Sequence, residues 1–278
     1  MKMLFLLASC FVYSACAQTP AVQKYVINPG EVRWVEFPLP KGEVRLLCAD
    51  KEVKFSSKNS KGEAVIVADY FMTDKSFTCV VESKKKVVTE LQFTVEPKEY
   101  KAEVLTVNPR KIKLSPKDQK RADAEQVVLN KIYASSLPEF QFKTPFMRPL
   151  KGHVTSVYGI KRVYNGMKKG QHLGTDFRAA IGDKVPAANA GKIVFAGDLF
   201  YTGWTVIIDH GLDIFTVYGH LSKTLVSAGD VVKRGDIIAL SGNTGRTSGP
   251  HLHWGVKVQG NYIDGFSLVD ETKKVFPE

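Results

Sequence analysis

The chain has 278 residues, of which 44% are hydrophobic, and its 39 Lys and Arg against 28 Asp and Glu give a formal net charge of +11. This length and composition allow one or two domains with a full hydrophobic core and exclude a disordered or collagen-like chain. The charge indicates an anionic partner, but residues 18–145 and 146–278 each carry a net +5, and this even spread argues against nucleic-acid binding. All six histidines lie between His153 and His253, and 19 of the 22 glycines follow residue 145, so the two halves are expected to be different kinds of domain.

Residues 1–17 have the features of a secretory signal peptide. A short basic start is followed by an apolar run, Leu4–Val12, and by a cleavage site of the A-x-A type that ends at Ala17. The run is too short to span a bilayer comfortably, which argues against a membrane anchor, and we expect no transmembrane segment after signal removal. The protein is therefore expected in the periplasm or cell envelope. Lipid attachment at Cys10 or Cys16 is a less favoured alternative, because the apolar segment before Cys10 is very short and Tyr13 is a poor residue three positions before Cys16.

Residues 18–100 are predicted to form a small β-sandwich-like domain, similar in organisation to an immunoglobulin domain. Turn residues separate short runs that are rich in Val, Phe and Thr, and Trp34 is expected in the core. The runs are Glu31–Phe37, Glu43–Cys48, Glu52–Phe55, Ala64–Asp69, Phe77–Glu82 and Val87–Glu96.

Two cysteines remain after signal removal, Cys48 and Cys79. Alternation along their strands turns both sulfur atoms toward the same apolar layer, and an oxidising compartment favours a disulfide between them. Such a bond would contribute roughly 3–4 kcal/mol in the chain-entropy description. The alternative is a pair of buried free thiols.

Residues 101–145 are predicted to connect the two domains and to contain one helix at about 116–135. Ser115 can cap the helix, and Pro116 suits its first position. An apolar stripe at helical spacing is expected to face the protein, and it consists of Ala124, Val127, Val128 and Ile132.

Residues 146–270 alternate short strands with glycine-rich turns, and residues 271–278 form a tail. Many short strands with such connections indicate a compact, antiparallel β domain. The fold class expected for the whole chain is therefore mostly β, with an N-terminal sandwich, a connecting helix and a C-terminal antiparallel domain.

Chemistry-bearing residues gather in the second half, in three short motifs that contain His172 with Asp176, then His220, then His251 with His253. Residues two apart on a strand share a face, so His251 and His253 project together. Two imidazoles on one face suit a metal site or a ligand with a base better than they suit a core. Three N or O ligands with an open fourth position are the arrangement of a catalytic zinc site. The alternative for His172 and Asp176 is a surface ion pair.

No glutamate lies between Phe140 and Asp270, which excludes the H-E-x-x-H layout with its glutamate base. A zinc-activated water would therefore need a histidine or an aspartate as its base. His210 lies in a turn signal and is predicted to be structural.

In order and spacing, these motifs resemble those of the lysostaphin-type, LytM-like zinc metallopeptidases, which cut peptide bridges in bacterial cell walls. The resemblance covers roughly residues 146–265 and includes the framing segments 182–187, 228–236 and 242–245. It implies a LytM-like peptidase domain that binds one zinc ion. His172, Asp176 and His253 match the zinc ligands, and His220 and His251 match the two catalytic histidines. We assign the base role to His251 and the oxyanion or leaving-group role to His220, with the division between them left open.

The resemblance implies an exported peptidoglycan endopeptidase that hydrolyses cross-link peptide bonds. Family members cut glycine bridges or direct D-Ala–diaminopimelate cross-links, and the signal peptide favours the direct cross-link by analogy. The alternative is a non-catalytic, wall-binding activator of another murein hydrolase. Such relatives typically lack one or more of the five site positions, all of which this sequence retains. The sandwich and the helix precede the peptidase domain, and we hypothesise that they occlude its active site.

Overall fold

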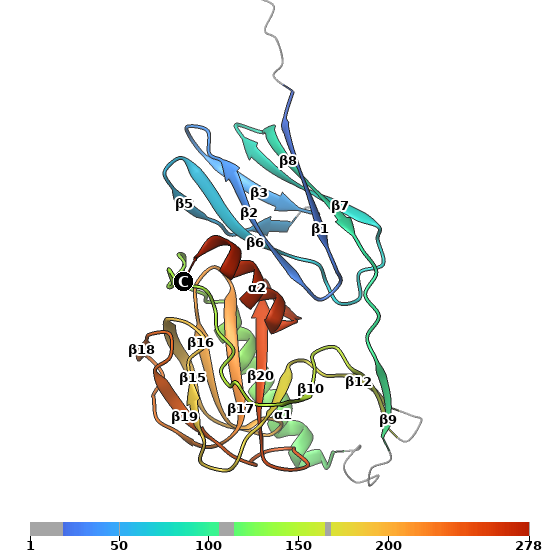
Figure 1. The fold of residues 1–278 in the computed structure, drawn as a ribbon, viewed down its shortest axis with the longest axis vertical. Helices are drawn as coiled ribbons and strands as arrows, with labels where there is room; N and C mark the ends of the chain where they lie inside the picture. The colour runs from blue at the N-terminus through green and yellow to red at the C-terminus, as the bar shows by residue number, and fades with distance from the viewer. Residues whose placement is uncertain (1–18, 50, 106–113, 165–167, 278) are drawn as a thin grey trace, which may run out of the picture.

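The computed structural model describes residues 19–49, 51–105, 114–164 and 168–277, so the predicted signal peptide lies outside the described residues. The fold is mostly β, as predicted, with two β domains and the C-terminal helix α2 (Gly265–Val275) lying between them (Figure 1). No helix in the described part of the chain is long and apolar enough to cross a membrane.

The N-terminal domain is a sandwich of a five-stranded and a three-stranded sheet. The larger sheet has the order β1-β8-β7-β3-β4, in which β1 pairs with β8 in parallel, and the smaller has the order β2-β6-β5. Each run predicted from the sequence contains a strand, whereas β1 and β5 were not predicted. The strands are β1 (Ala21–Ile27), β2 (Val32–Pro38), β3 (Val44–Cys48), β4 (Lys51–Val53), β5 (Ser56–Lys58), β6 (Lys61–Val67), β7 (Ser76–Ser83) and β8 (Lys86–Val95).

A disulfide joins Cys48 and Cys79 in the core of this sandwich, as predicted. The two cysteines lie directly opposite each other on β3 and β7. The strand alternation that buries Leu46 and Val81 also turns the two sulfur atoms into the same layer.

The connector contributes a strand and a helix to the second domain. Strand β9 (Ala102–Leu105) pairs in parallel with β11 (Lys161–Tyr164), and helix α1 spans Pro116–Tyr133. The helix is capped as predicted, because the Ser115 hydroxyl accepts a hydrogen bond from the Asp118 amide.

The apolar stripe predicted for α1 is wrong. Val127 and Val128 are 55% and 49% exposed, and Ala124 is exposed as well. The helix docks instead through polar contacts, in which Arg121 pairs with Asp198 and Glu125 accepts the amide hydrogen of Phe200. Leu129 and Tyr133 complete this attachment by packing against the buried cluster of Ile207, Phe215 and Val217.

The C-terminal domain is built on a mostly antiparallel ten-stranded sheet whose main path is β10-β13-β20-β17-β16-β15-β18. Strand β19 pairs with β14 and β17, and β21 pairs with β20. The ten strands are β10 (Val154–Ser156), β13 (Thr175–Arg178), β14 (Lys184–Pro186), β15 (Gly191–Leu199), β16 (Gly203–Asp209), β17 (Ile214–Thr224), β18 (Val231–Val232), β19 (Ile237–Ser241), β20 (His251–Val258) and β21 (Asn261–Ile263). Strand β12 (Lys168–Gln171) pairs with β11 in a separate three-stranded sheet that also contains β9.

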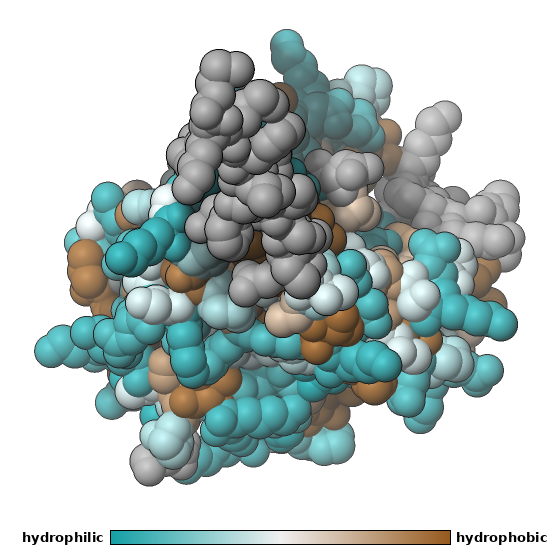
Figure 2. All heavy atoms as spheres, turned by 90° about the horizontal axis from the view of Figure 1, so that it is seen from above, coloured by the Kyte–Doolittle hydropathy of each residue, from teal (hydrophilic) through white to brown (hydrophobic). Residues whose placement is uncertain are grey.

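One hydrophobic core runs from the peptidase-like sheet into the sandwich. Trp34 of β2 is buried in it, stacked on Phe140 with ring centroids 4.9 Å apart. Beside this contact, the Arg33 guanidinium pairs with the Glu271 carboxylate of α2, which also accepts the Trp34 amide hydrogen. Trp34 is thus a core residue, as predicted, and its core joins the two domains. Seen from above, the molecule is mostly hydrophilic, with small scattered apolar patches (Figure 2).

Candidate active site

Two neighbouring strands, β13 and β20, carry the centre of the candidate site. In their antiparallel register, Asp176 lies opposite His253 and Arg178 lies opposite His251. Leu252 on the other face of β20 is fully buried in the core, which leaves the histidines on the face that lines the cleft. The strand alternation predicted for His251 and His253 is therefore present.

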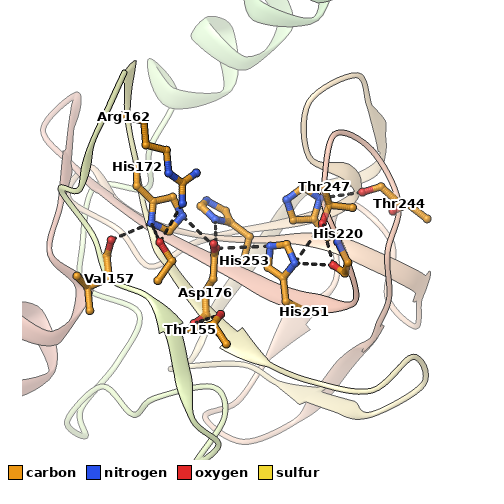
Figure 3. A network of polar contacts seen from close by, with 12 residues as sticks. Thr155, Val157, Arg162, His172, Asp176, His220, Thr244, Thr247, His251 and His253 are labelled. Atoms are coloured by element: carbon orange, nitrogen blue, oxygen red, sulfur yellow. Dashed lines mark hydrogen bonds and ion pairs between the residues drawn. The ribbon is translucent and has the colours of Figure 1, made fainter. Parts of the chain in front are cut away.

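Asp176 is the meeting point of the candidate metal ligands (Figure 3). Its Oδ1 atom lies 3.0 Å from His172 Nε2 and 2.8 Å from His253 Nδ1. One ligand atom from each of the three residues lies within 4.8 Å of the others. His172 and Asp176 are 5% and 8% exposed, so the alternative of a surface ion pair is wrong.

The hydrogen bonds of His172 show that these residues fit a metal ion. The Val157 carbonyl lies 2.8 Å from His172 Nδ1, so this nitrogen carries a hydrogen and donates it. In the neutral ring, Nε2 then has only a lone pair, and it faces a carboxylate oxygen, which is a second acceptor. A cation between them satisfies both. Two imidazoles and one carboxylate are a zinc ligand set, and the Val157 contact is the kind of outer support that orients a ligating histidine.

The electrostatics of the cluster favour the metal-binding protonation states. Burial alone would raise the pKa of Asp176, but the interactions of its carboxylate with the His172 and His253 rings outweigh burial and hold that pKa well below its usual range. Burial lowers the pKa of His253, against the opposing effect of Asp176. An ionised carboxylate and a neutral imidazole are the forms that bind a metal ion.

His220 and His251 lie beside this cluster with their rings 4.7 Å apart and are fixed in the same way. His220 Nδ1 donates to the Thr244 carbonyl at 2.8 Å, and His251 Nδ1 donates to the Gly249 carbonyl at 2.8 Å. Each ring therefore keeps a free lone pair on Nε2 in its neutral form, and that of His251 lies 3.7 Å from Asp176 Oδ1. Burial lowers the pKa of His220 to about 4, so this ring is neutral at pH 7.

The backbone at His220 is in the left-handed region, with a φ of 59°. This conformation costs a non-glycine residue about 1 kcal/mol. Its amide donates to the Thr202 carbonyl at 2.6 Å, which holds the bend in β17 that turns the imidazole into the cleft. Strain of this kind is characteristic of functional positions.

The five candidate residues line one open cleft of about 1230 Å³. Part of its wall comes from the connector, through Leu114, Ser115, Asp118 and Arg121. Among the described residues, none of the sandwich lines this cleft. The sandwich contacts α2, and α2 packs against Trp254, whose side chain lies on the face of β20 opposite the two histidines.

The sequence analysis missed several contributors to the site. The carbonyls of Val157, Thr244 and Gly249 carry no side-chain signal, so no motif could have revealed them. Arg178 could have been found, because it lies two residues after Asp176 and therefore on the same face of any strand that contains both. His210 lies apart from the cleft: it is fully buried between the Ala190 carbonyl and the Thr216 hydroxyl, in keeping with its predicted structural role.

A buried carboxylate between two imidazoles, with two further fixed imidazoles beside it, is the arrangement of a metal-dependent hydrolase. The profile of peptidase family M23 matches residues 170–265, a range that contains all five candidate residues. The domain that contains residues 170–265 belongs to peptidase family M23.

Comparisons with known proteins cover the two domains unequally. The chain is 41% identical to the peptidoglycan DD-endopeptidase ShyA of Vibrio cholerae over 115 residues, which are 41% of this chain and 27% of ShyA. It is 43% identical to lysostaphin of Staphylococcus simulans over 99 residues, or 35% of this chain and 20% of that protein. The match thus spans about a quarter of the length of these curated relatives. A crystal structure of an M23 peptidase from Pseudomonas aeruginosa superposes with a TM-score of 0.68 at 26% identity, covering 87% of this chain and 93% of the other, so both domains share its fold.

Proposed function

We propose that this protein is an exported, zinc-dependent peptidoglycan endopeptidase that hydrolyses D-Ala–diaminopimelate cross-links in the cell wall. The observation that carries the proposal is the convergence of His172, Asp176 and His253 on one point, beside two imidazoles with free lone pairs. The similarity to ShyA, a peptidoglycan DD-endopeptidase, supports the substrate class. The disulfide supports an oxidising compartment such as the periplasm.

In this proposal, His172, Asp176 and His253 hold the zinc ion. Zinc, when bound, supplies a Lewis acid that polarises the scissile carbonyl and makes water nucleophilic near neutral pH. The described contacts of these ligands fix their orientation before the ion arrives, since Val157 holds the His172 ring and strand register holds His253 against Asp176.

The geometry favours His251 as the base. Its Nδ1 hydrogen is engaged by Gly249, so its Nε2 lone pair is available to accept a proton from the attacking water. The Asp176 carboxylate, 3.7 Å from that nitrogen, would stabilise the imidazolium that forms.

His220 is assigned to the leaving group. A neutral ring whose Nδ1 hydrogen is engaged by Thr244 has no hydrogen to give an oxyanion. The proton that His251 takes from the water would pass to Nε2 of His220, whose ring lies 4.7 Å away, and the lowered pKa of His220, about 4, suits it to release that proton to the departing amine.

Zinc content and murein digestion, measured together, test these roles. His253→Ala should lose both zinc and activity, whereas His251→Gln should keep zinc and lose activity by roughly 10²- to 10⁴-fold. His153→Ala, at an exposed position outside the cleft, is the matched control. If purified wild-type protein binds no zinc and digests no murein while an amidase becomes active beside it, the activator alternative replaces this proposal.

A further inference from the structure

An arginine lies next to the proposed base. Arg178 is the last residue of β13 and stands opposite His251 in the register of β13 and β20. Directly opposite residues on antiparallel strands project from the same face, with Cβ atoms about 5 Å apart. Arg178 is exposed and lines the cleft. Its guanidinium therefore projects on the face that carries the two histidines of β20.

Two other guanidinium groups that line the cleft, those of Arg121 and Arg162, lie near carboxylates. Arg121 pairs with both Glu125 and Asp198, at 2.6 and 2.9 Å. Arg162 donates to the Ser156 hydroxyl and lies 4.0 Å from Glu103. Within the described residues, no carboxylate forms an ion pair with Arg178. An exposed guanidinium in the wall of a substrate cleft, with no carboxylate paired to it, is a ready site for a planar anion, and it binds carboxylates in a two-pronged geometry.

The proposed substrate offers such an anion at a fixed place. In a direct cross-link, the carbon that bears the scissile amide nitrogen is one end of diaminopimelate, and that carbon also carries a free carboxylate. A glycine bridge has no charged group beside the bond that is cut. A positive charge beside the base thus distinguishes the two kinds of cross-link.

We propose that Arg178 is a specificity residue that binds the diaminopimelate carboxylate next to the scissile amide. The inference rests on the proposed function and extends it by naming the leaving-group contact. Because hydrogen bonds between charged groups are among the stronger ones in proteins, the contact should favour a substrate with this carboxylate by about tenfold to a hundredfold in kcat/KM.

Three synthetic cross-linked peptides test the inference with the zinc-loaded, full mature chain. The first carries the free carboxylate beside the scissile amide, the second carries an amide in its place, and the third carries an amide at the C-terminal carboxylate of the stem. We expect the wild-type protein to prefer the first peptide over the second by about tenfold or more and to treat the first and third alike.

Variants assign the preference to the residue. Arg178→Gln should bring the ratio of kcat/KM for the first and second peptides close to one, and Arg178→Lys should leave an intermediate ratio. Arg121 lies in the same cleft, but Glu125 and Asp198 already neutralise its guanidinium, so Arg121→Gln should keep the wild-type ratio. Zinc content and thermal unfolding of each variant show that it is folded.

The inference is overturned if the wild-type protein shows no preference, if Arg178→Gln keeps it, or if only the third peptide reveals it. The last result would place the C-terminal carboxylate of the stem at Arg178. Failure of the proposed function has a different signature, because zinc-loaded wild-type protein would then hydrolyse none of the three peptides.

Discussion

Asp176 and His253 face each other directly across β13 and β20, with Oδ1 and Nδ1 2.8 Å apart. The core fixes this register, because Phe177 and Leu252, which follow and precede them on their strands, are fully buried on the opposite face. A slip of either strand by one residue would expose that strand's hydrophobic side chain and turn its candidate ligand inward. Folding of the sheet therefore assembles two of the three candidate ligands.

Zinc should stabilise the folded protein. The three candidate ligands are assembled only in the folded state, so at zinc concentrations of 100 to 1,000 times the dissociation constant the free energy of unfolding should rise by about 3–4 kcal/mol. Thermal unfolding with zinc and with a chelator measures this difference. His253→Ala should lose most of it and His153→Ala should keep it. An equal effect of zinc on both variants would place the ion elsewhere.

His210 should make stability depend on pH. Burial lowers its pKa to about 4, against about 6.5 in the unfolded chain, so the unfolded state binds the proton more tightly. The contribution of the neutral His210 ring to the free energy of unfolding is fully present above about pH 6.5. It decreases as the pH falls and no longer changes below about pH 4. Between pH 7.5 and pH 5, the loss due to His210 should be about 2 kcal/mol. Urea unfolding at both pH values measures how much the free energy of unfolding falls between them. This fall should be smaller in His210→Gln than in the wild-type protein by about 2 kcal/mol. An equal fall in both proteins would exclude this role of His210.

Trp34 should stabilise the junction of the two domains. Removal of this buried indole, which stacks on Phe140, should cost about 3–5 kcal/mol in Trp34→Ala. Trp204 is 41% exposed, so Trp204→Ala should cost much less and serves as the control. Denaturant unfolding measures both. An equal loss of unfolding free energy in the two variants would contradict a hydrophobic core that the two domains share.

The disulfide should contribute about 3–4 kcal/mol to stability, because it closes a loop between residues 31 positions apart in the sequence. Urea unfolding of the oxidised protein, the reduced protein and the variant Cys48→Ala/Cys79→Ala measures this contribution. The last two should agree with each other and fall below the first. Equal stability of all three would show that the bond does not constrain the unfolded chain.

The sequence predicted those features that depend on local spacing. Strand alternation placed His251 and His253 on one face and brought Cys48 to Cys79, and the Ser115 cap marked the start of α1. The resemblance to a peptidase family then brought His172 and His220 to the same site. These predictions succeed because they need only the two-residue period of a strand or the first turn of a helix.

Features set by distant partners could not be predicted. The sequence predicts a tail from residue 271, but Glu271 is buried in α2, where it pairs with Arg33 of the other domain. Strand β9 exists because it pairs with β11, far along the chain. The wrong stripe on α1 has the same origin, since polar partners at β15 and an apolar cluster on β16 and β17 determine which side of the helix faces the protein.

Of the two segments that could occlude the active site, only the connector lines the cleft in the part of the chain that the structure describes. The start of α1 lines the cleft, whereas the sandwich is attached behind the sheet through α2 and Trp34. Regulation of access would therefore act on the Arg121–Asp198 attachment of the helix.

The most direct test of the account is mass spectrometry of muropeptides from purified sacculi that contain direct diaminopimelate cross-links, after digestion by the zinc-loaded mature protein. We expect cross-linked dimers to be converted into monomers, each cut exposing a D-Ala carboxyl and a diaminopimelate amine, and a chelator to abolish the conversion. Unchanged dimers, or conversion that a chelator does not affect, would contradict a zinc-dependent cross-link endopeptidase.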